Sequence, residues 1–160
     1  MIELIVVISI IGTLLLFSFP VFRDAVFFTD GSNEVGRLVR LMEDLKTRAI
    51  EGHVDYLLHL EAGADLIWVT HENMDETARQ AAKDNGVSLA QTIRFTDVAY
   101  PGRESVPGGP EYVIRFRKEG FSDHALIHLT QSGDALTLKL GPFISGIQLV
   151  DGHISLEDCI

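Results

Sequence analysis

The sequence predicts an α+β protein in which a long N-terminal hydrophobic helix, followed by an amphipathic helix, packs on antiparallel β-sheet. Three observations predict this class. Residues 2–22 form an almost uninterrupted apolar run, residues 34–49 repeat apolar side chains at helical spacing, and the chain from residue 54 onward runs or alternates apolar between turn residues. We therefore expect a hydrophobic helix at residues 1–28 and one globular domain at residues 29–160.

The apolar run at residues 2–22 has the length and composition of a membrane-crossing helix. Its only charged side chain is Glu3, and its few polar residues are hydroxyl residues. About 20 apolar residues at about 1.5 Å each span the ~30 Å hydrocarbon core of a bilayer. The run lacks the basic n-region, short core and small-residue cleavage site of a secretory signal. A plain membrane anchor would also explain the run, whereas its length disfavours a buried helix of a soluble domain.

The same run resembles the N-terminal segment of type IV pilins and of the pseudopilins of type II secretion systems. It reads IELIVVISIIGTLLLFSFPVF, in which Glu3 matches the family's glutamate, Gly12 a common mid-helix glycine and Pro20 the helix-kinking proline. In that family the prepilin is cut after a glycine, and a methylated aromatic residue begins the mature chain. No basic leader or Gly-Phe junction precedes Ile2, and Met1 stands where the family has leucine. The resemblance therefore implies a leader and two further residues before Met1 in the native protein.

The resemblance also implies roles for three residues in subunit assembly. A lone carboxylate in an apolar filament core needs a positive partner, and in the family that partner is the N-terminal amine of a neighbouring subunit. Glu3 would then fix docking and register, with a partly solvated glutamate at the membrane edge as the alternative. Pro20 removes a backbone donor and should kink the helix. Gly12 is the third residue that the resemblance assigns to subunit assembly.

An amphipathic helix is predicted at about residues 33–51. Its apolar face repeats at i, i+3 and i+4 and comprises Val35, Leu38, Leu41, Met42, Leu45 and Ala49. Charged residues occupy the other face, and Gly52 is a natural C-cap.

Strands and turns follow the amphipathic helix. Residues 54–60 and 66–70 predict a hairpin, residues 72–85 a short surface helix or insertion with a thin apolar stripe, and residues 92–99 another strand. Residues 100–110 read as a loop. Short strands at 112–117, 125–130, 136–140 and 146–150, separated by Gly-containing turns, favour antiparallel meanders.

This element order, with the Arg48-Ala49-Ile50 ending of the amphipathic helix and the stretch IRFRKEG from Ile114, is similar to the minor pseudopilins of the GspH/FimT type. The resemblance implies a structural subunit that sits in the bacterial inner membrane with its globular domain in the periplasm. It would then join the pseudopilus near its tip. Its expected partners are major and minor pseudopilins, the inner membrane before assembly, and exported proteins. The alternatives are a minor pilin of a type IV pilus or DNA-uptake machine, and an unrelated single-pass anchored binding domain.

No pattern in the sequence favours an enzyme or a cofactor. His124 and His128 are four apart but fall in a strand-like context without the glutamate of a zinc-protease helix, so we expect exposed strand histidines and no metal. Asp-Gly pairs at residues 30–31 and 151–152 read as turns rather than calcium loops, and Trp68, Tyr100 and Tyr112 as core or strand residues.

Charge and cysteine content exclude two further classes. The net charge of −10 argues against a nucleic-acid surface, which needs clustered Lys and Arg. The single cysteine, Cys159, permits no internal disulfide.

Overall fold

The fold is described from a computed structural model, for residues 34–89, 93–102, 109, 111–143 and 146–156. All of these lie in the compact unit Glu34–Ile160. The predicted hydrophobic helix at residues 1–28, with Glu3, Gly12 and Pro20, lies outside the described residues. Within the described ranges, no helix combines the length and the apolar character needed to cross a membrane.

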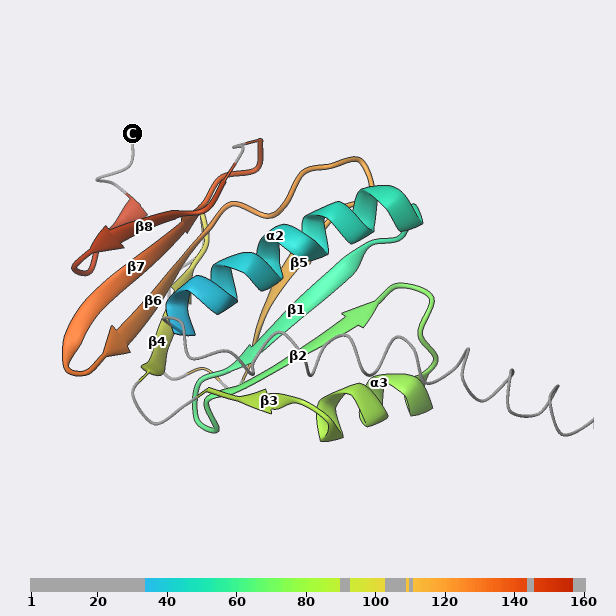
Figure 1. Cartoon of the computed structure of the whole chain (residues 1–160), viewed down its shortest axis with the longest axis horizontal. Helices are drawn as coiled ribbons and strands as arrows, with labels where there is room; N and C mark the ends of the chain where they lie inside the picture. Colours follow the sequence, from blue (N-terminus) through green and yellow to red (C-terminus); the bar gives the residue numbers. More distant parts are fainter. Residues whose placement is uncertain (1–33, 90–92, 103–108, 110, 144–145, 157–160) are drawn as a thin grey trace, which may run out of the picture. The chain divides into compact units, whose positions relative to one another are not determined.

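The described chain is α+β, with a helix packed on antiparallel sheets as predicted. Helix α2 (Glu34–Gly52) contacts strands β1 and β5 (Figure 1). Sheet A has the order β3 (Val87–Ser88), β2 (Leu66–His71), β1 (Tyr56–Glu61) and β5 (Tyr112–Phe116). Sheet B has the order β4 (Ile93–Ala99), β6 (Ala125–Gln131), β7 (Asp134–Leu140) and β8 (Gln148–Asp151). A short helix, α3 (Glu76–Asp84), connects β2 to β3.

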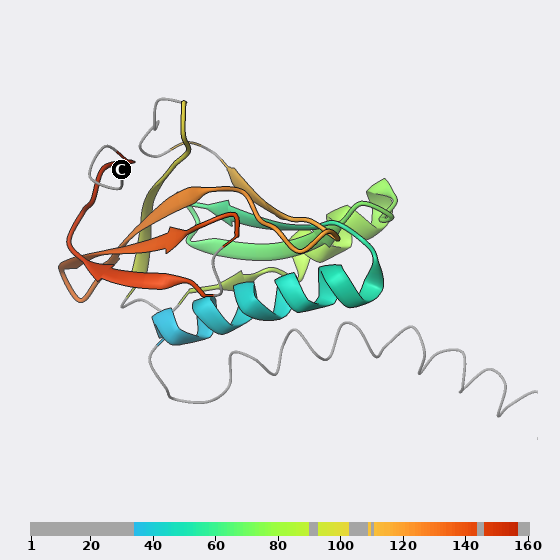
Figure 2. The same cartoon turned by 90° about the horizontal axis from the view of Figure 1, so that it is seen from above.

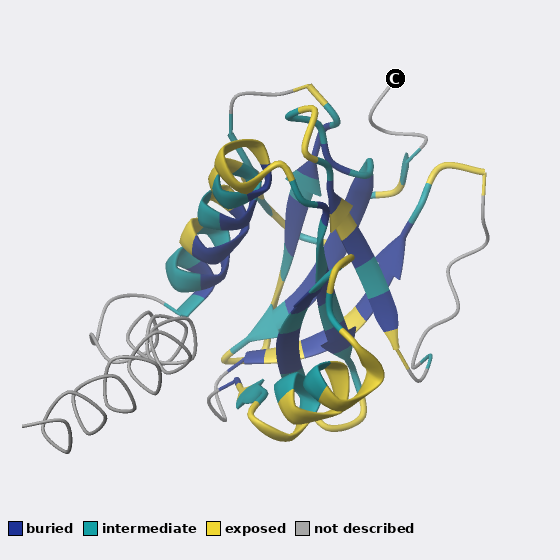
Figure 3. Ribbon diagram, turned by 90° about the vertical axis from the view of Figure 1, so that its right-hand side faces the viewer, coloured by how far each residue is buried: buried dark blue, intermediate teal, exposed yellow. Residues whose placement is uncertain are grey.

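Helix α2 buries one continuous apolar stripe. The buried residues are those predicted from the helical period: Val35, Leu38, Leu41, Met42, Leu45 and Ala49. This stripe faces the strands, whereas the opposite side of the helix is half-buried or exposed (Figures 2 and 3). Burial of the stripe against the sheets is what fixes the helix, because an isolated helix of this length is marginal in water.

The end of α2 differs in one detail from the prediction. Gly52 is the last helical residue, but the left-handed conformation that ends the helix belongs to His53, with φ 52°. The N–H of Val54 donates to the carbonyl of Ala49 (3.2 Å) and that of His53 to Ile50 (3.4 Å), which is the Schellman pattern.

The predicted hairpin forms the centre of sheet A. Strands β1 and β2 pair antiparallel from Tyr56↔His71 to Glu61↔Leu66, and β5 pairs with the other edge of β1. Successive side chains of a strand point to opposite faces, so the two faces of sheet A carry different residues. One face carries the fully buried Leu58, Leu60 and Ile114, and the opposite face carries polar and aromatic side chains.

Helix α3 is the short surface helix that the sequence predicts. The Asp75 carboxylate accepts a hydrogen bond from the N–H of Ala78 (2.7 Å) and so caps the first turn. None of the α3 residues is buried, so the predicted apolar stripe does not form a core contact.

The last third of the chain divides between the two sheets, which corrects the prediction of meanders throughout. Strands β6, β7 and β8 do form an antiparallel meander, but β5 pairs with β1, and β4 pairs with β6. Sequence-neighbouring strands β4 and β5 therefore lie in different sheets. Local periodicity reports which residues are in a strand, and carries no information on which distant strand is its partner.

Candidate functional site

A groove lined mostly by polar side chains lies on sheet A. Its volume is about 410 Å³. The floor is the sheet face turned away from the apolar core, and α3 forms one wall. The lining residues are Asp55, Leu57, His59, Trp68, Thr70, Glu72, Glu76, Arg79, Gln80, Lys83, Glu111 and Arg115.

A hydrogen-bonded chain centred on His59 crosses the groove floor. Nδ1 of His59 lies 2.6 Å from Oε1 of Glu111, and Nε2 lies 2.8 Å from the hydroxyl of Thr70. Because a carboxylate only accepts, Nδ1 of His59 carries a proton and donates it to Glu111. The imidazole also stacks on Trp68, with ring centroids 5.0 Å apart and planes 7° apart.

This chain places a hydroxyl, an imidazole and a carboxylate in the order used by acyl-transfer enzymes. Thr70, however, is only 4% exposed and lies within strand β2. A nucleophile has to be accessible to its substrate. The geometry therefore fits a set of hydrogen bonds that connects neighbouring strands better than it fits a catalytic triad.

Charges of both signs line the groove. Lys83 lies over the Trp68 ring, 4.6 Å from its centroid, and its ammonium is 3.3 Å from a Glu61 carboxylate oxygen. Arg115 and Asp55 form a second pair at 3.7 Å. Mixed charge around one aromatic ring is a poor match for an apolar ligand.

His71, at the end of β2, has an environment that disfavours its charged form. Burial lowers its pKa from the usual 6.5, and the positive charge of Arg79 lowers it further, against the opposing effect of Glu72. Its Nδ1 is buried, and within the described part of the chain this nitrogen has no hydrogen-bond partner.

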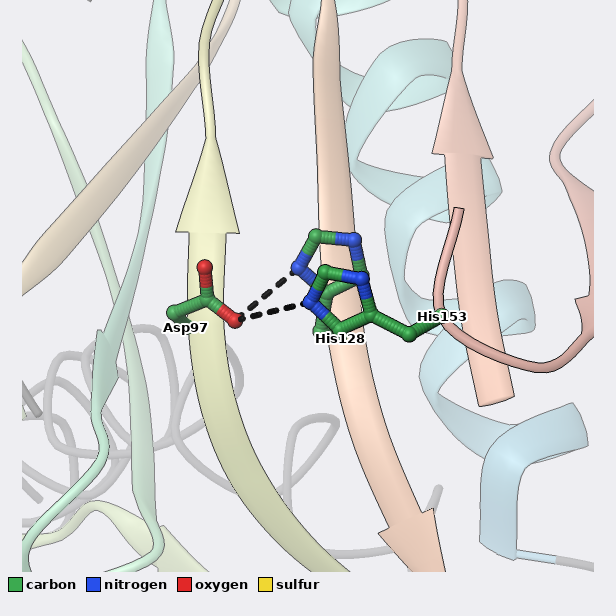
Figure 4. Close-up of side chains that lie close together, drawn as sticks. All are labelled: Asp97, His128 and His153. Carbon is green, nitrogen blue, oxygen red and sulfur yellow. Dashed lines mark hydrogen bonds and ion pairs between the residues drawn. The ribbon is translucent and has the colours of Figure 1, made fainter. Parts of the chain in front are cut away.

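A second cluster of polar side chains lies on sheet B (Figure 4). Asp97 of β4 and His128 of β6 are direct cross-strand neighbours, each 3% exposed. His128 Nδ1 lies 2.9 Å from Asp97 Oδ1, and His128 Nε2 lies 2.9 Å from the carbonyl oxygen of Ile154. His153, on the segment after β8, stacks on His128 with centroids 3.7 Å apart and places Nε2 3.9 Å from the same Asp97 oxygen.

The prediction of exposed strand histidines is wrong for His128. The run Ala125–Leu129 is buried at every position, because sheet B is covered on both faces at β6. His124 lies before the strand and is half-buried, and the structure does not bring it to His128 as a pair of ligands. A continuous apolar run, in place of alternation, is the sequence signal that points to burial on both faces.

The structure tests only some of the other residues that the sequence analysis names. Glu3, Gly12, Pro20, the Asp-Gly pair at residues 30–31 and Cys159 lie outside the described residues. The Asp-Gly pair at 151–152 is a turn, with Gly152 at φ 89°. Trp68 and Tyr112 are buried strand residues, as predicted. The same prediction is wrong for Tyr100, which follows the end of β4 and is half-buried.

Asp97, His153, His59 and Glu111 were not predicted as site residues. Asp97 is 31 positions from its partner His128, and His59 is 52 positions from its partner Glu111. His153 meets His128 and Asp97 from the segment after β8. No local pattern in the sequence therefore marks these residues. The chain matches no protein-family model, no curated protein and no solved structure.

Proposed function

We propose that this protein is a minor pseudopilin of the type II secretion kind, a structural subunit that enters a pseudopilus near its tip and helps to export folded proteins. One observation carries the proposal. The apolar run at residues 2–22 holds a single charged residue, Glu3, and a proline, Pro20, at the spacing of the pilin family. A plain membrane anchor has no need of a carboxylate at its start, because that charge costs energy in lipid.

The described fold is compatible with this proposal. An amphipathic helix that begins at Glu34, soon after the apolar run, is followed by antiparallel sheets. That is the element order on which the resemblance to the GspH/FimT type depends. In this proposal the inner membrane holds the apolar run before assembly, and the globular domain lies in the periplasm.

The groove on sheet A is the surface we assign to a neighbouring subunit or to an exported protein. It offers ion-pairing groups of both signs, an aromatic ring and a short wall of exposed helix, α3. Such a surface gives specificity through charge complementarity.

The first test is the N-terminus of the native protein, purified from membranes of cells with and without prepilin peptidase. We expect a cleaved, N-methylated chain that begins two residues before Met1 and has Glu3 as its fifth residue. Intact mass and N-terminal sequencing measure this directly. A native chain that starts at Met1 and is identical in both strains would contradict the proposal and favour the plain anchored domain.

The second test concerns assembly. Glu3→Gln should abolish cross-linking to other pseudopilins while leaving membrane insertion intact, because the amine of the neighbouring subunit loses its carboxylate. Glu43→Gln, which removes an exposed charge on α2, is the matched control and should assemble normally. Cross-linking to type IV pilins instead of pseudopilins would favour the alternative of a minor pilin, and equal assembly of both variants would contradict the role of Glu3.

A further inference from the structure

Asp97, His128 and His153 bring three metal-ligating side chains from three segments to one point on sheet B. One ligand atom from each residue lies within 4.8 Å of the other two. Asp97 and His128 are buried, whereas the His153 side chain is 59% exposed. Two of the three side chains therefore come from the buried strands β4 and β6, and the exposed one comes from the segment after β8 (Figure 4).

The hydrogen bond from His128 to the backbone fixes the tautomer of its ring. A carbonyl oxygen only accepts, so Nε2 of His128 must carry the proton that it donates to Ile154 (2.9 Å). In the neutral ring the lone pair is then on Nδ1, which points at a carboxylate oxygen of Asp97 only 2.9 Å away. The contact therefore requires either a second ring proton that His128 donates to Asp97 or a cation that both atoms bind.

His153 brings a second imidazole to the same carboxylate oxygen. Its Nε2 is 3.9 Å from Asp97 Oδ1, which is too long for a hydrogen bond. Its ring lies against His128, with planes 18° apart. A metal ion lies in the plane of each imidazole that binds it, so the exposed His153 ring would have to turn out of this stack for both rings to share one ion.

The spacing of the ligand atoms is close to that of a tetrahedral site. Bonds of about 2.0 to 2.1 Å at tetrahedral angles separate ligand atoms by about 3.3 to 3.4 Å. The observed separations of 2.9 and 3.9 Å from Asp97 Oδ1 lie on either side of that value. Rotation of the exposed His153 side chain would shorten only the longer separation, whereas the separation within the buried pair is slightly shorter than the tetrahedral value.

We propose that Asp97, His128 and His153 bind a divalent transition-metal ion of the zinc class, with water in the fourth position. Two imidazoles and a carboxylate are a donor set that such ions accept. The His128–Ile154 hydrogen bond supplies the outer contact that orients a metal-bound histidine. Because the ligands come from β4, β6 and the segment after β8, the ion would fasten the C-terminal segment onto sheet B.

Zinc binding to the full chain tests this proposal. The protein is purified in mild detergent without a histidine tag, stripped with a chelator, and titrated with Zn²⁺ by calorimetry. We expect one ion per chain. His153→Ala should weaken binding by more than about 100-fold, since loss of an outer-shell partner alone costs 10- to 100-fold. This variant removes an exposed side chain, so the fold should persist.

His124→Ala is the matched control, because it removes a half-buried histidine of the same domain that is outside the cluster. It should bind Zn²⁺ like the wild type. Equal binding by wild type and His153→Ala, or a loss of binding in His124→Ala, would overturn the proposal.

Two spectroscopic readouts identify the species between His128 and Asp97. Co²⁺ in place of Zn²⁺ should give visible absorption bands typical of four-coordination, absent in His153→Ala. Nitrogen NMR of the metal-free protein should show ring signals of His128 that shift when Zn²⁺ is added. Signals of a doubly protonated ring that do not change with Zn²⁺ would show that a proton alone bridges the pair, and would overturn the metal site.

Discussion

Asp65 links the two sheets, and its replacement gives a sharp test of the fold. The residue ends the turn between β1 and β2 and has φ 48°. Its Oδ1 accepts a hydrogen bond from the N–H of Phe95 in β4 (3.1 Å), and its carbonyl accepts one from Leu89 (2.9 Å). Strand β4 is an edge of sheet B, so the Asp65 carboxylate satisfies a backbone donor on that edge.

The structure gives an order of effects for three substitutions. Asp65→Asn keeps an acceptor oxygen and tolerates positive φ, so it should cost less than about 1 kcal/mol. Asp65→Gly keeps the conformation but loses a hydrogen bond to a charged acceptor, worth about 1.5 to 3 kcal/mol. Asp65→Ala loses the same bond and adds the strain of positive φ, so it should cost about 2.5 to 5 kcal/mol in total.

Urea unfolding of the full chain in mild detergent measures these differences in the free energy of unfolding. Trp68 is the single tryptophan and is 5% exposed on the strand that follows Asp65, so its fluorescence reports the transition. An equal loss in the Asn and Ala variants would refute the role of the acceptor oxygen. A Gly variant less stable than the Ala variant would refute the contribution of the left-handed backbone.

Two further predictions concern β2 and the end of α3. Burial lowers the pKa of His71 below 6.5, so the unfolded chain binds more protons and the free energy of unfolding should fall as the pH falls below 6.5. His71→Gln should make that fall smaller in unfolding curves at pH 7.5 and pH 5, and an unchanged pH dependence would contradict this. Gly86→Ala places a Cβ 2.9 Å from the carbonyl of Lys83 and 3.1 Å from that of Ile67, both rigid backbone atoms, and should cost about 1 to 3 kcal/mol. Gly63→Ala, which meets nothing within 4 Å, is its control, and equal melting temperatures of the two variants would count against the clash.

The elements of the fold were predictable wherever one period dominated the sequence. In α2 the apolar spacing identifies all the buried side chains, because a single face of the helix is buried. The β1–β2 hairpin is equally local, since five turn residues separate two apolar strands. The partner of β5 was not predictable, because the pairing of Tyr56 with Phe116 joins strands far apart in the sequence.

The cluster of Asp97, His128 and His153 depends on a β-bulge in β4, which the apolar spacing of the sequence did not predict. In β4 the core-facing residues Phe95 and Val98 are three apart, which an uninterrupted strand with a period of two does not allow. A bulge between Phe95 and Asp97 absorbs the extra residue and turns Asp97 to the face that carries His128. In the sequence alone, Asp97 is a polar residue in a segment whose alternation of apolar and polar residues is interrupted, and it cannot be told apart from other polar residues.

The outer faces of the two sheets differ in how a partner could reach them. On sheet B, Thr137 is fully buried; its hydroxyl donates to the carbonyl of Gly152 (2.6 Å) and accepts from the N–H of Ile154 (3.3 Å). With the bond from His128 to Ile154, these contacts hold the C-terminal segment across β6 and β7. A partner on that face would first have to break them, and a metal ion at Asp97 would raise that cost. The groove on sheet A carries no such cover among the described residues. The recognition of a subunit or an exported protein that we propose for it should therefore depend on its side chains and should be unaffected by zinc.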